Sequence, residues 1–132
     1  MSISVIVPIY NEQDNIRLLY EDIEHVLSRF GRAFEIIFID DGSRDASADR
    51  LRELAERDGR VRVIRFRRNY GQTAAMQAGL QAASGEVVVT IDGDLQNDPA
   101  EMYNLAVERS AGETLDGMRK LLYRLLRETR AA

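Results

Sequence analysis

The 132-residue sequence contains no cysteine, which excludes disulfide bonds, thiolate nucleophiles and cysteine-ligated zinc or iron–sulfur sites. Its single histidine, His25, falls within a helical pattern, where we expect it to face solvent or the flank of the helix. A Ser-His-Asp catalytic triad is therefore not expected. The single lysine is Lys120, and the sequence has neither a phosphate-binding G-x-x-x-x-G-K-[ST] motif nor a dinucleotide-binding G-x-G-x-x-G motif.

Long apolar runs and strong net charge are missing as well. No run approaches the roughly 20 residues of a membrane-spanning helix. The opening stretch MSISVIVPIYNE lacks the basic start and the small-residue cleavage site of a secretory signal peptide, so we expect a cytoplasmic protein or one at the cytoplasmic face of a membrane. The net charge of −4 gives no broad basic field, and nucleic-acid binding is not expected.

Short apolar runs alternate with segments of helical periodicity. The pattern predicts strands over residues 2–8, 34–39, 60–66 and 86–91, with the third at an edge of the sheet. It predicts helices over residues 14–30, about 45–58 and 72–84, and a fourth helix opening at Asp98-Pro99. This alternation indicates an α/β fold with a mostly parallel, Rossmann-like sheet and helices on both faces.

The ends of the predicted helices carry capping residues. Asn11 is the predicted N-cap of the first helix and Gly31 follows its end, while Asp45 or Ser47 caps the second. The composition changes near Gly112, after which the residues predict a basic, leucine-rich helix. We therefore divide the chain into a domain over residues 1–111 and an amphipathic C-terminal helix over residues 112–132.

Polar residues gather where each predicted strand ends. Because parallel strands end at the same edge of a sheet, where α/β proteins bind ligands, these residues are expected to form one site. The candidate binding residues are Pro8, Tyr10, Asn11, Glu12, Asp40, Asp41, Gly71, Gln72, Asp92, Gly93 and Asp94. Each cluster taken alone is also typical of helix caps and turns.

The stretch VVVTIDGDLQNDP predicts a divalent metal site. Asp92 and Asp94 place two carboxylates on a turn in which Gly93 permits a tight bend, and Gln96 adds a neutral oxygen. Such oxygen ligands suit Mg²⁺ or Mn²⁺ that bridges to substrate phosphates. An EF-hand loop beginning at Asp92 is excluded, because Asn97 and Tyr103 stand where glycine and glutamate are required.

The stretch IDDGSRDAS predicts a second set of ligand contacts. Asp40 and Asp41 end the second strand, where carboxylates can accept hydrogen bonds from a nucleobase edge or a ribose hydroxyl. Ser43 and Asp45 are assigned to capping of the helix that follows.

Four stretches in this order resemble the successive motifs of the GT-A glycosyltransferases of family 2: VIVPIYNEQDNI, EIIFIDDGSRDAS, RNYGQTAAMQAGL and GEVVVTIDGDLQNDP. The resemblance covers about residues 3–110 and is strongest to the polyprenyl-phosphate and dolichyl-phosphate sugar transferases. It implies a UDP- or GDP-sugar donor and a polyprenyl phosphate acceptor at a membrane surface. It further implies that Pro8, Tyr10, Glu12 and Asp41 hold the nucleoside, and that Asp92, Asp94 and Gln96 bind the metal that grips the donor diphosphate.

The sequence departs from the family after Gly112. The strand, the acceptor region and the membrane helices that family members add are not recognisable, so we expect a donor half that is truncated relative to the family. No catalytic base is identified. Arg67 and Arg68 lie where positive charge can assist a phosphate, or they are surface charges beside an edge strand.

Three functions are compared on this basis. The first is a metal-dependent glycosyltransferase, and the alternative is a catalytically incomplete nucleotide-sugar-binding or assembly module. A receiver-like or phosphatase-like protein is disfavoured, because Pro8-Ile9-Tyr10-Asn11 stands where such a protein has an acidic pair. An exposed edge at the fourth strand is expected to permit self-association. The C-terminal helix is expected to pack within the chain or in a dimer, and contact with an anionic membrane is the alternative.

Overall fold

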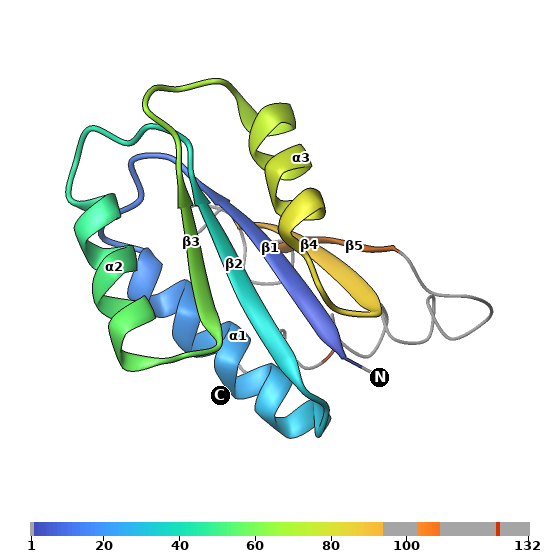
Figure 1. Cartoon of the computed structure of the whole chain (residues 1–132). Helices are drawn as coiled ribbons and strands as arrows, with labels where there is room; N and C mark the ends of the chain where they lie inside the picture. Colours follow the sequence, from blue (N-terminus) through green and yellow to red (C-terminus); the bar gives the residue numbers. More distant parts are fainter. Residues whose placement is uncertain (1, 94–102, 109–123, 125–132) are drawn as a thin grey trace.

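A five-stranded sheet forms the centre of the computed structural model, which describes residues 2–93, 103–108 and 124 (Figure 1). The strand order is β3-β2-β1-β4-β5. The strands are β1 (Ile3–Ile9), β2 (Phe34–Asp40), β3 (Val61–Arg65), β4 (Val87–Gly93) and β5 (Tyr103–Glu108). The first four run parallel and β5 is antiparallel to β4, which confirms the predicted Rossmann-like, mostly parallel sheet.

The helices cover both faces of this sheet, as predicted. They are α1 (Ile16–Phe30), α2 (Ser47–Arg57) and α3 (Gln72–Ala82). Figure 1 shows α1 and α2 on one side of the sheet and α3 on the other. Each parallel connection between β1, β2, β3 and β4 passes through one of these helices, which brings the following strand into the same direction as the last.

The central strands are apolar on both faces because both faces are covered. In β2, Ile36 and Phe38 belong to the buried cluster under α1 and α2, whereas Ile37 and Ile39 belong to the cluster under α3. All four side chains are fully buried. A strand buried on both sides reads as a continuous apolar run rather than as an alternating one, which is the pattern of FEIIFID.

The predicted limits of α1 are right at one end and wrong at the other. Gly31 ends the helix in a left-handed conformation with φ 74°, as glycine commonly does. Asn11 does not cap the helix, which begins at Ile16 after Asn15. The side-chain oxygen of Asn11 instead accepts a hydrogen bond from the N–H of Arg44, in the loop after β2.

Two expectations about the end of the sheet are wrong. The fourth helix expected to open at Asp98-Pro99 does not extend over residues 103–108, which form β5. The sequence YNLAVE is a short, mostly apolar run, which is compatible with a strand, and its backbone pairs with β4. Consequently β4 is not an exposed edge, whereas β3 lies at an edge as predicted.

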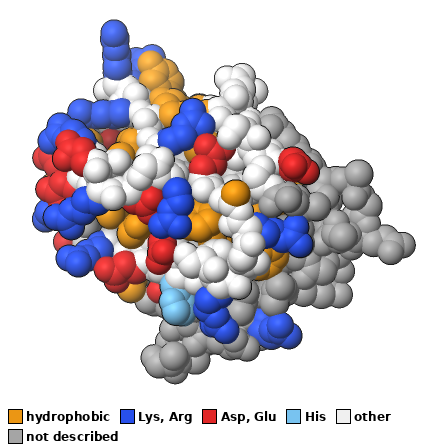
Figure 2. All heavy atoms as spheres, turned by 60° about the horizontal axis from the view of Figure 1, so that its bottom comes forward, with side chains coloured by type: hydrophobic (Ala, Val, Ile, Leu, Met, Phe, Trp, Pro, Cys, Tyr) orange, Lys and Arg blue, Asp and Glu red, His pale blue; other side chains and the backbone are white. Residues whose placement is uncertain are grey.

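Charges of both signs are mixed on the face shown in Figure 2, where basic and acidic side chains lie next to each other. His25 is exposed on α1, as expected. None of the helices in the described part of the chain is long and apolar enough to cross a membrane. The predicted C-terminal helix over residues 112–132 lies outside the described residues, apart from Arg124, which is helical and exposed.

Candidate functional site

Three of the four predicted polar clusters meet in one pocket at the carboxyl end of the sheet. The pocket has a volume of about 340 Å³ and lies between the ends of β1 and β2 and the start of α3. The predicted site residues that line it are Pro8, Tyr10, Glu12, Asp41, Gly71 and Gln72. Residues from three separate loops therefore share one pocket, as the parallel topology requires.

Three further residues line the pocket and were not predicted as site residues. Ile9 and Leu19 are buried and give the pocket an apolar wall. Nothing in the sequence distinguishes Leu19 from the other buried apolar residues of α1. Asn69 could have been predicted from its residue type, because a side-chain amide in the loop after β3 can donate a hydrogen bond to a carboxylate in the loop after β2.

Asp41 joins the second and third loops. Its Oδ1 accepts a hydrogen bond from the N–H of Tyr70 at 2.8 Å. Its Oδ2 accepts one from the N–H of Gly71 and one from Nδ2 of Asn69, both at 3.1 Å. The backbone N–H of Asp41 donates to the carbonyl of Ile9 in β1 at 2.8 Å. The residue is 4% exposed, and through these contacts it ties all three loops of the pocket together.

Gly42 allows the third loop to pack directly on the second. Its φ is 72°, in the left-handed region that glycine adopts without strain. A Cβ atom at this position would lie 2.6 Å from the carbonyl oxygen of Arg68 and 2.5 Å from the nitrogen of Asn69. Both contacts involve backbone atoms, so a larger residue would force the loop away from Asp41.

Asp40 lies beneath the pocket rather than on its wall. It is fully buried, and its Oδ1 accepts a hydrogen bond from the N–H of Ser43 at 2.9 Å. Its Oδ2 has no hydrogen-bond partner, and Nε of Arg65 lies 3.9 Å away. A buried carboxylate is costly unless it is paired, so this residue fixes the start of the second loop at an energetic cost.

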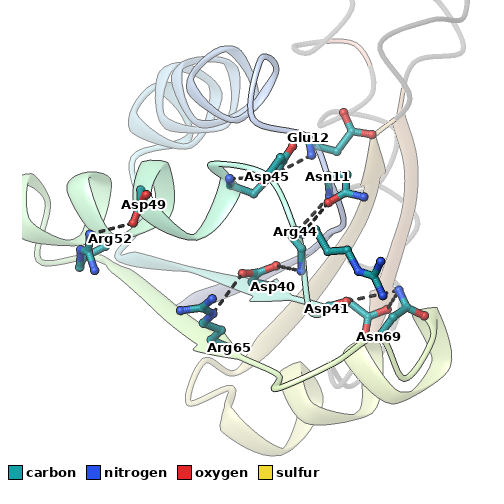
Figure 3. A network of polar contacts seen from close by, with 12 residues as sticks. Asn11, Glu12, Asp40, Asp41, Arg44, Asp45, Asp49, Arg52, Arg65 and Asn69 are labelled. Atoms are coloured by element: carbon teal, nitrogen blue, oxygen red, sulfur yellow. Dashed lines mark hydrogen bonds and ion pairs between the residues drawn. The ribbon is translucent and has the colours of Figure 1, made fainter.

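The first and second loops are also joined to each other, as Figure 3 shows for Asn11 and Arg44. Ser43 and Asp45 were both assigned to helix capping. Asp45 does accept a hydrogen bond from the N–H of Ser47, the first residue of α2, at 2.8 Å. Ser43 does not cap this helix, because its Oγ accepts the N–H of Asn11 at 2.9 Å. Burial acts to raise the pKa of Asp45, but its hydrogen bonds with Ser47 and Gln13 outweigh burial and lower the pKa.

The loop after β3 presents a cationic and aromatic surface beside the pocket. Arg67 and Arg68 are both exposed. The guanidinium of Arg68 lies 4.8 Å from the centre of the Tyr70 ring, and Tyr70 makes an edge-to-face contact with Phe66 at 5.6 Å. Arg68 is therefore held against Tyr70 by a cation–π contact, and it lines no part of the pocket.

The predicted metal site falls at the end of β4. Asp92 and Gly93 are the last residues of this strand, and their backbones pair with Asn104 and Tyr103 of β5. Asp94 and Gln96 lie outside the described residues. Within the described part of the chain, no group of three or more histidine or acidic side chains could hold a metal ion. The assignment of Asp92, Asp94 and Gln96 as metal ligands stays a prediction.

Solved structures share this fold and belong to GT-A glycosyltransferases. One is the mannosyltransferase PcManGT from Pyrobaculum calidifontis in complex with GDP-Man and Mn²⁺, with a TM-score of 0.59 and 26% sequence identity. The match covers 68% of this chain and 26% of that protein. Another is S. aureus TarS 1-349 in complex with UDP-GlcNAc, with a TM-score of 0.59 and 26% sequence identity, and the match covers 70% of this chain and 26% of TarS 1-349. The sheet and its helices therefore have the GT-A fold.

Residues 4–114 match the family described as glycosyl transferase family 2, and the chain belongs to that family. It is 48% identical over 110 residues to an undecaprenyl-phosphate 4-deoxy-4-formamido-L-arabinose transferase of Pseudomonas aeruginosa (strain LESB58). That match covers 83% of this chain and 32% of the relative. The chain is 39% identical over 123 residues to a dodecaprenyl-phosphate galacturonate synthase of Rhizobium johnstonii, covering 91% of this chain and 36% of that protein. The chain thus spans about a third of the length of these relatives.

Proposed function

We propose that the chain is the donor-binding part of a glycosyltransferase that moves a sugar from a nucleoside diphosphate to a polyprenyl phosphate. The observation that carries the proposal is the pocket built around Asp41 at the carboxyl end of a family 2 sheet. The relatives are named as transferases or synthases of undecaprenyl and dodecaprenyl phosphates, which supports the acceptor class. Action at the cytoplasmic face of a membrane, where such an acceptor is embedded, is part of the same proposal.

The hydrogen bonding of Asp41 favours one kind of base. A carboxylate has about four acceptor positions, and three of those on Asp41 are filled by the loop after β3. The remaining position, on Oδ1, can accept a single N–H. Uracil presents a single imide N–H, whereas guanine presents two adjacent donors that match a carboxylate with both oxygens available. We therefore infer that the donor is a UDP-sugar rather than a GDP-sugar.

Other pocket residues supply the remaining contacts in this proposal. Tyr10 is 43% exposed and offers an aromatic face on which a base can stack, and Pro8, Ile9 and Leu19 provide the apolar wall. Glu12 accepts a hydrogen bond from Nδ2 of Asn15 at 2.7 Å through Oε2, which leaves Oε1 for a ribose hydroxyl.

A divalent cation completes the proposed donor site. Asp92, Asp94 and Gln96 offer oxygen atoms, the ligands that Mg²⁺ and Mn²⁺ prefer. When bound, the cation would neutralise the diphosphate that leaves with the nucleoside. The fold supports this placement in one respect, because β4 lies beside β1 and ends at the same edge of the sheet as the pocket loops.

Titration calorimetry with UDP and with GDP, each with and without Mn²⁺, tests the donor proposal. We expect UDP to bind at least about tenfold more tightly than GDP, a difference of about 1.4 kcal/mol, and we expect Mn²⁺ to be required. In the variant Asp94→Ala, the addition of Mn²⁺ should no longer increase the affinity for UDP. Equal affinity for UDP and GDP would overturn the choice of base, and absence of binding would overturn the donor site.

A transfer assay separates the enzyme from its alternative, a module that binds the donor without turnover. The purified chain is incubated with a UDP-sugar, Mn²⁺ and undecaprenyl phosphate in detergent, and lipid-linked sugar is measured. Product that disappears in Asp94→Ala supports a transferase. If the chain binds UDP but forms no lipid-linked sugar, it is a donor-binding module without transferase activity.

A further inference from the structure

Two loops beside the pocket exchange hydrogen bonds in a reciprocal pattern. The N–H of Asn11 donates to Oγ of Ser43 at 2.9 Å. In return, the side-chain Oδ1 of Asn11 accepts the N–H of Arg44 at 2.8 Å. One residue of the loop after β1 is thus bound through both its backbone and its side chain to two successive residues of the loop after β2. Figure 3 shows the contact between Asn11 and Arg44.

The pattern repeats two residues further along both loops. The N–H of Gln13 donates to Oδ2 of Asp45 at 3.3 Å, and Oε1 of Gln13 accepts the N–H of Ala46 at 2.8 Å. Between these two exchanges, the N–H of Glu12 donates to Oγ of Ser47 at 3.0 Å. We call these five hydrogen bonds the loop clasp.

The clasp holds the first loop in a conformation that it would not otherwise favour. Asn11 has φ 51°, and in the described residues it is the one non-glycine residue with positive φ. Asparagine tolerates this left-handed conformation better than most residues, but the conformation still needs support from its surroundings. The partner side is fixed in turn, because Ser43 is 8% exposed and its N–H is bound by the buried Asp40.

The residues on both sides of Asn11 line the pocket, whereas neither Asn11 nor Ser43 does. Tyr10 precedes Asn11 and Glu12 follows it, so the conformation of Asn11 sets the directions of both pocket side chains. We propose that Asn11 and Ser43 are positioning residues for donor binding, which they serve by holding Tyr10 and Glu12 at the pocket wall. This inference rests on the proposed function, because it names how that same pocket is kept in a binding-competent shape.

The inference gives Asp40 a role that differs from direct ligand contact. Its Oδ1 orients Ser43, Ser43 binds Asn11, and Asn11 sets Tyr10 and Glu12. The buried carboxylate therefore acts on the pocket through two intervening residues. Preorganised side chains bind more tightly than mobile ones because less conformational entropy is lost on binding.

Two variants and a matched control test the proposal. Ser43→Ala removes the acceptor for the N–H of Asn11. Asn11→Gly keeps access to positive φ and removes the acceptor for the N–H of Arg44. Ser84→Ala is the control, because it removes a side-chain hydrogen bond of similar length, 2.7 Å to Glu35, at the opposite end of the sheet. UDP affinity is measured by calorimetry with Mn²⁺, and stability is measured by urea unfolding.

We expect Ser43→Ala and Asn11→Gly each to weaken UDP binding by about tenfold, because each variant loses one hydrogen bond that holds the first loop in its binding conformation. Ser84→Ala should lose comparable stability and keep UDP affinity within about twofold of the wild type. The conservative variants Ser43→Thr and Asn11→Asp keep the hydroxyl and the acceptor oxygen, and should restore affinity. Equal UDP affinity in Ser43→Ala and the wild type would overturn the inference.

Amide hydrogen exchange keeps this test independent of the proposed function. If the wild-type chain binds no nucleotide, the donor proposal fails, and the clasp is judged by exchange alone. The clasp predicts that Ser43→Ala speeds exchange of the Asn11, Glu12 and Gln13 amides at least about tenfold more than that of the Ile37 amide in β2. In the control Ser84→Ala, we expect no such difference between the loop amides and the Ile37 amide. If Ser43→Ala likewise changes the exchange rates of all these amides by the same factor, the inference is overturned.

Discussion

Glu35 shows at the scale of one residue how a charge secures the end of the sheet opposite the pocket. Its Oε2 accepts hydrogen bonds from Oγ of Ser4 at 2.6 Å and from the N–H and Oγ of Ser84 at 2.8 and 2.7 Å. Its Oε1 accepts one from Arg62 at 3.0 Å. Burial acts to raise the pKa of Glu35, but these bonds outweigh it and lower the pKa from 4.5 to about 2.

This lowered pKa predicts a loss of stability in acid. A carboxylate with a lower pKa in the folded chain stabilises it above the unfolded pKa, so this contribution is lost as the pH falls from about 4.5 to about 2. Urea unfolding should show Glu35→Gln on the order of 2–3 kcal/mol less stable than the wild type at pH 7 and nearly equal to it at pH 2. Glu56→Gln, which removes the same charge from the exposed surface of α2, is the control. A pH-independent difference for Glu35→Gln would contradict the assignment.

Asp41 combines structure and binding in one carboxylate, so Asp41→Asn should affect both. An amide oxygen cannot replace both carboxylate oxygens, and at least one N–H of Tyr70 or Gly71 loses its partner. We expect a loss of about 1–3 kcal/mol in unfolding free energy and at least about tenfold in UDP affinity. Asp49→Asn, in an exposed pair with Arg52, should change neither. Wild-type UDP affinity in Asp41→Asn would remove this residue from the site.

At the scale of one element, α3 depends on close packing. This helix is rich in small residues and presses Gly79 onto the sheet. A Cβ atom at Gly79 would fall against Cγ2 of Ile6 and lie 2.9 Å from Cδ1 of Ile39. Both isoleucines are buried and cannot move aside freely.

Gly79→Ala therefore sets two effects against each other. Alanine favours a helix interior over glycine by about 1 kcal/mol, but overpacking a filled core costs about 1–3 kcal/mol. We expect overpacking to dominate, with a net loss of unfolding free energy in urea titrations. Gly59→Ala is the control, because a Cβ atom there meets nothing within 4 Å. A Gly79→Ala variant more stable than the wild type would show that α3 is packed more loosely than the structure indicates.

The elements also show where sequence patterns are sufficient. Strands β1, β2 and β4 are predictable because each is a short, mostly apolar run between turn residues. β3 is predictable because apolar residues alternate with arginine, and α1 and α2 because their apolar faces repeat every three to four residues. β5 was mistaken for a helix because Asp98-Pro99 is a typical helix start. The six residues of β5 are too few to outweigh that signal, and the strand is stabilised by antiparallel pairing with β4.

At the scale of the whole molecule, topology made much of the site predictable. Parallel strands end at one edge, so Tyr10, Asp41 and Gly71 could be grouped from the sequence before their contacts were known. The side-chain exchanges were not predictable in this way. Asn11 and Ser43 have residue types that commonly cap helices, and only the spatial proximity of their loops turns them toward each other.

The described part of the chain has a second hollow, which serves as an internal comparison for the pocket. It has a volume of about 430 Å³ and lies between α1 and α2, where it is lined among others by Arg17, Arg50, Glu53 and Arg57. It reaches Gln13 in the loop after β1, but its cationic and acidic side chains come mainly from α1 and α2, and it shares no lining residue with the pocket around Asp41. A ligand that binds only through its negative charge would bind at the arginines of this hollow. The proposed donor should bind instead in the pocket around Asp41.

The most direct test of the donor site is a titration of the ¹⁵N-labelled chain with UDP and Mg²⁺, followed by nuclear magnetic resonance. The account predicts that amide shifts concentrate at the residues of the pocket, above all Tyr10, Glu12, Asp41 and Gly71, and that Arg50 and Arg57 stay unchanged. Shifts at Arg50 and Arg57 without shifts around Asp41, or no shifts at all, would contradict the proposal that this pocket holds the nucleotide.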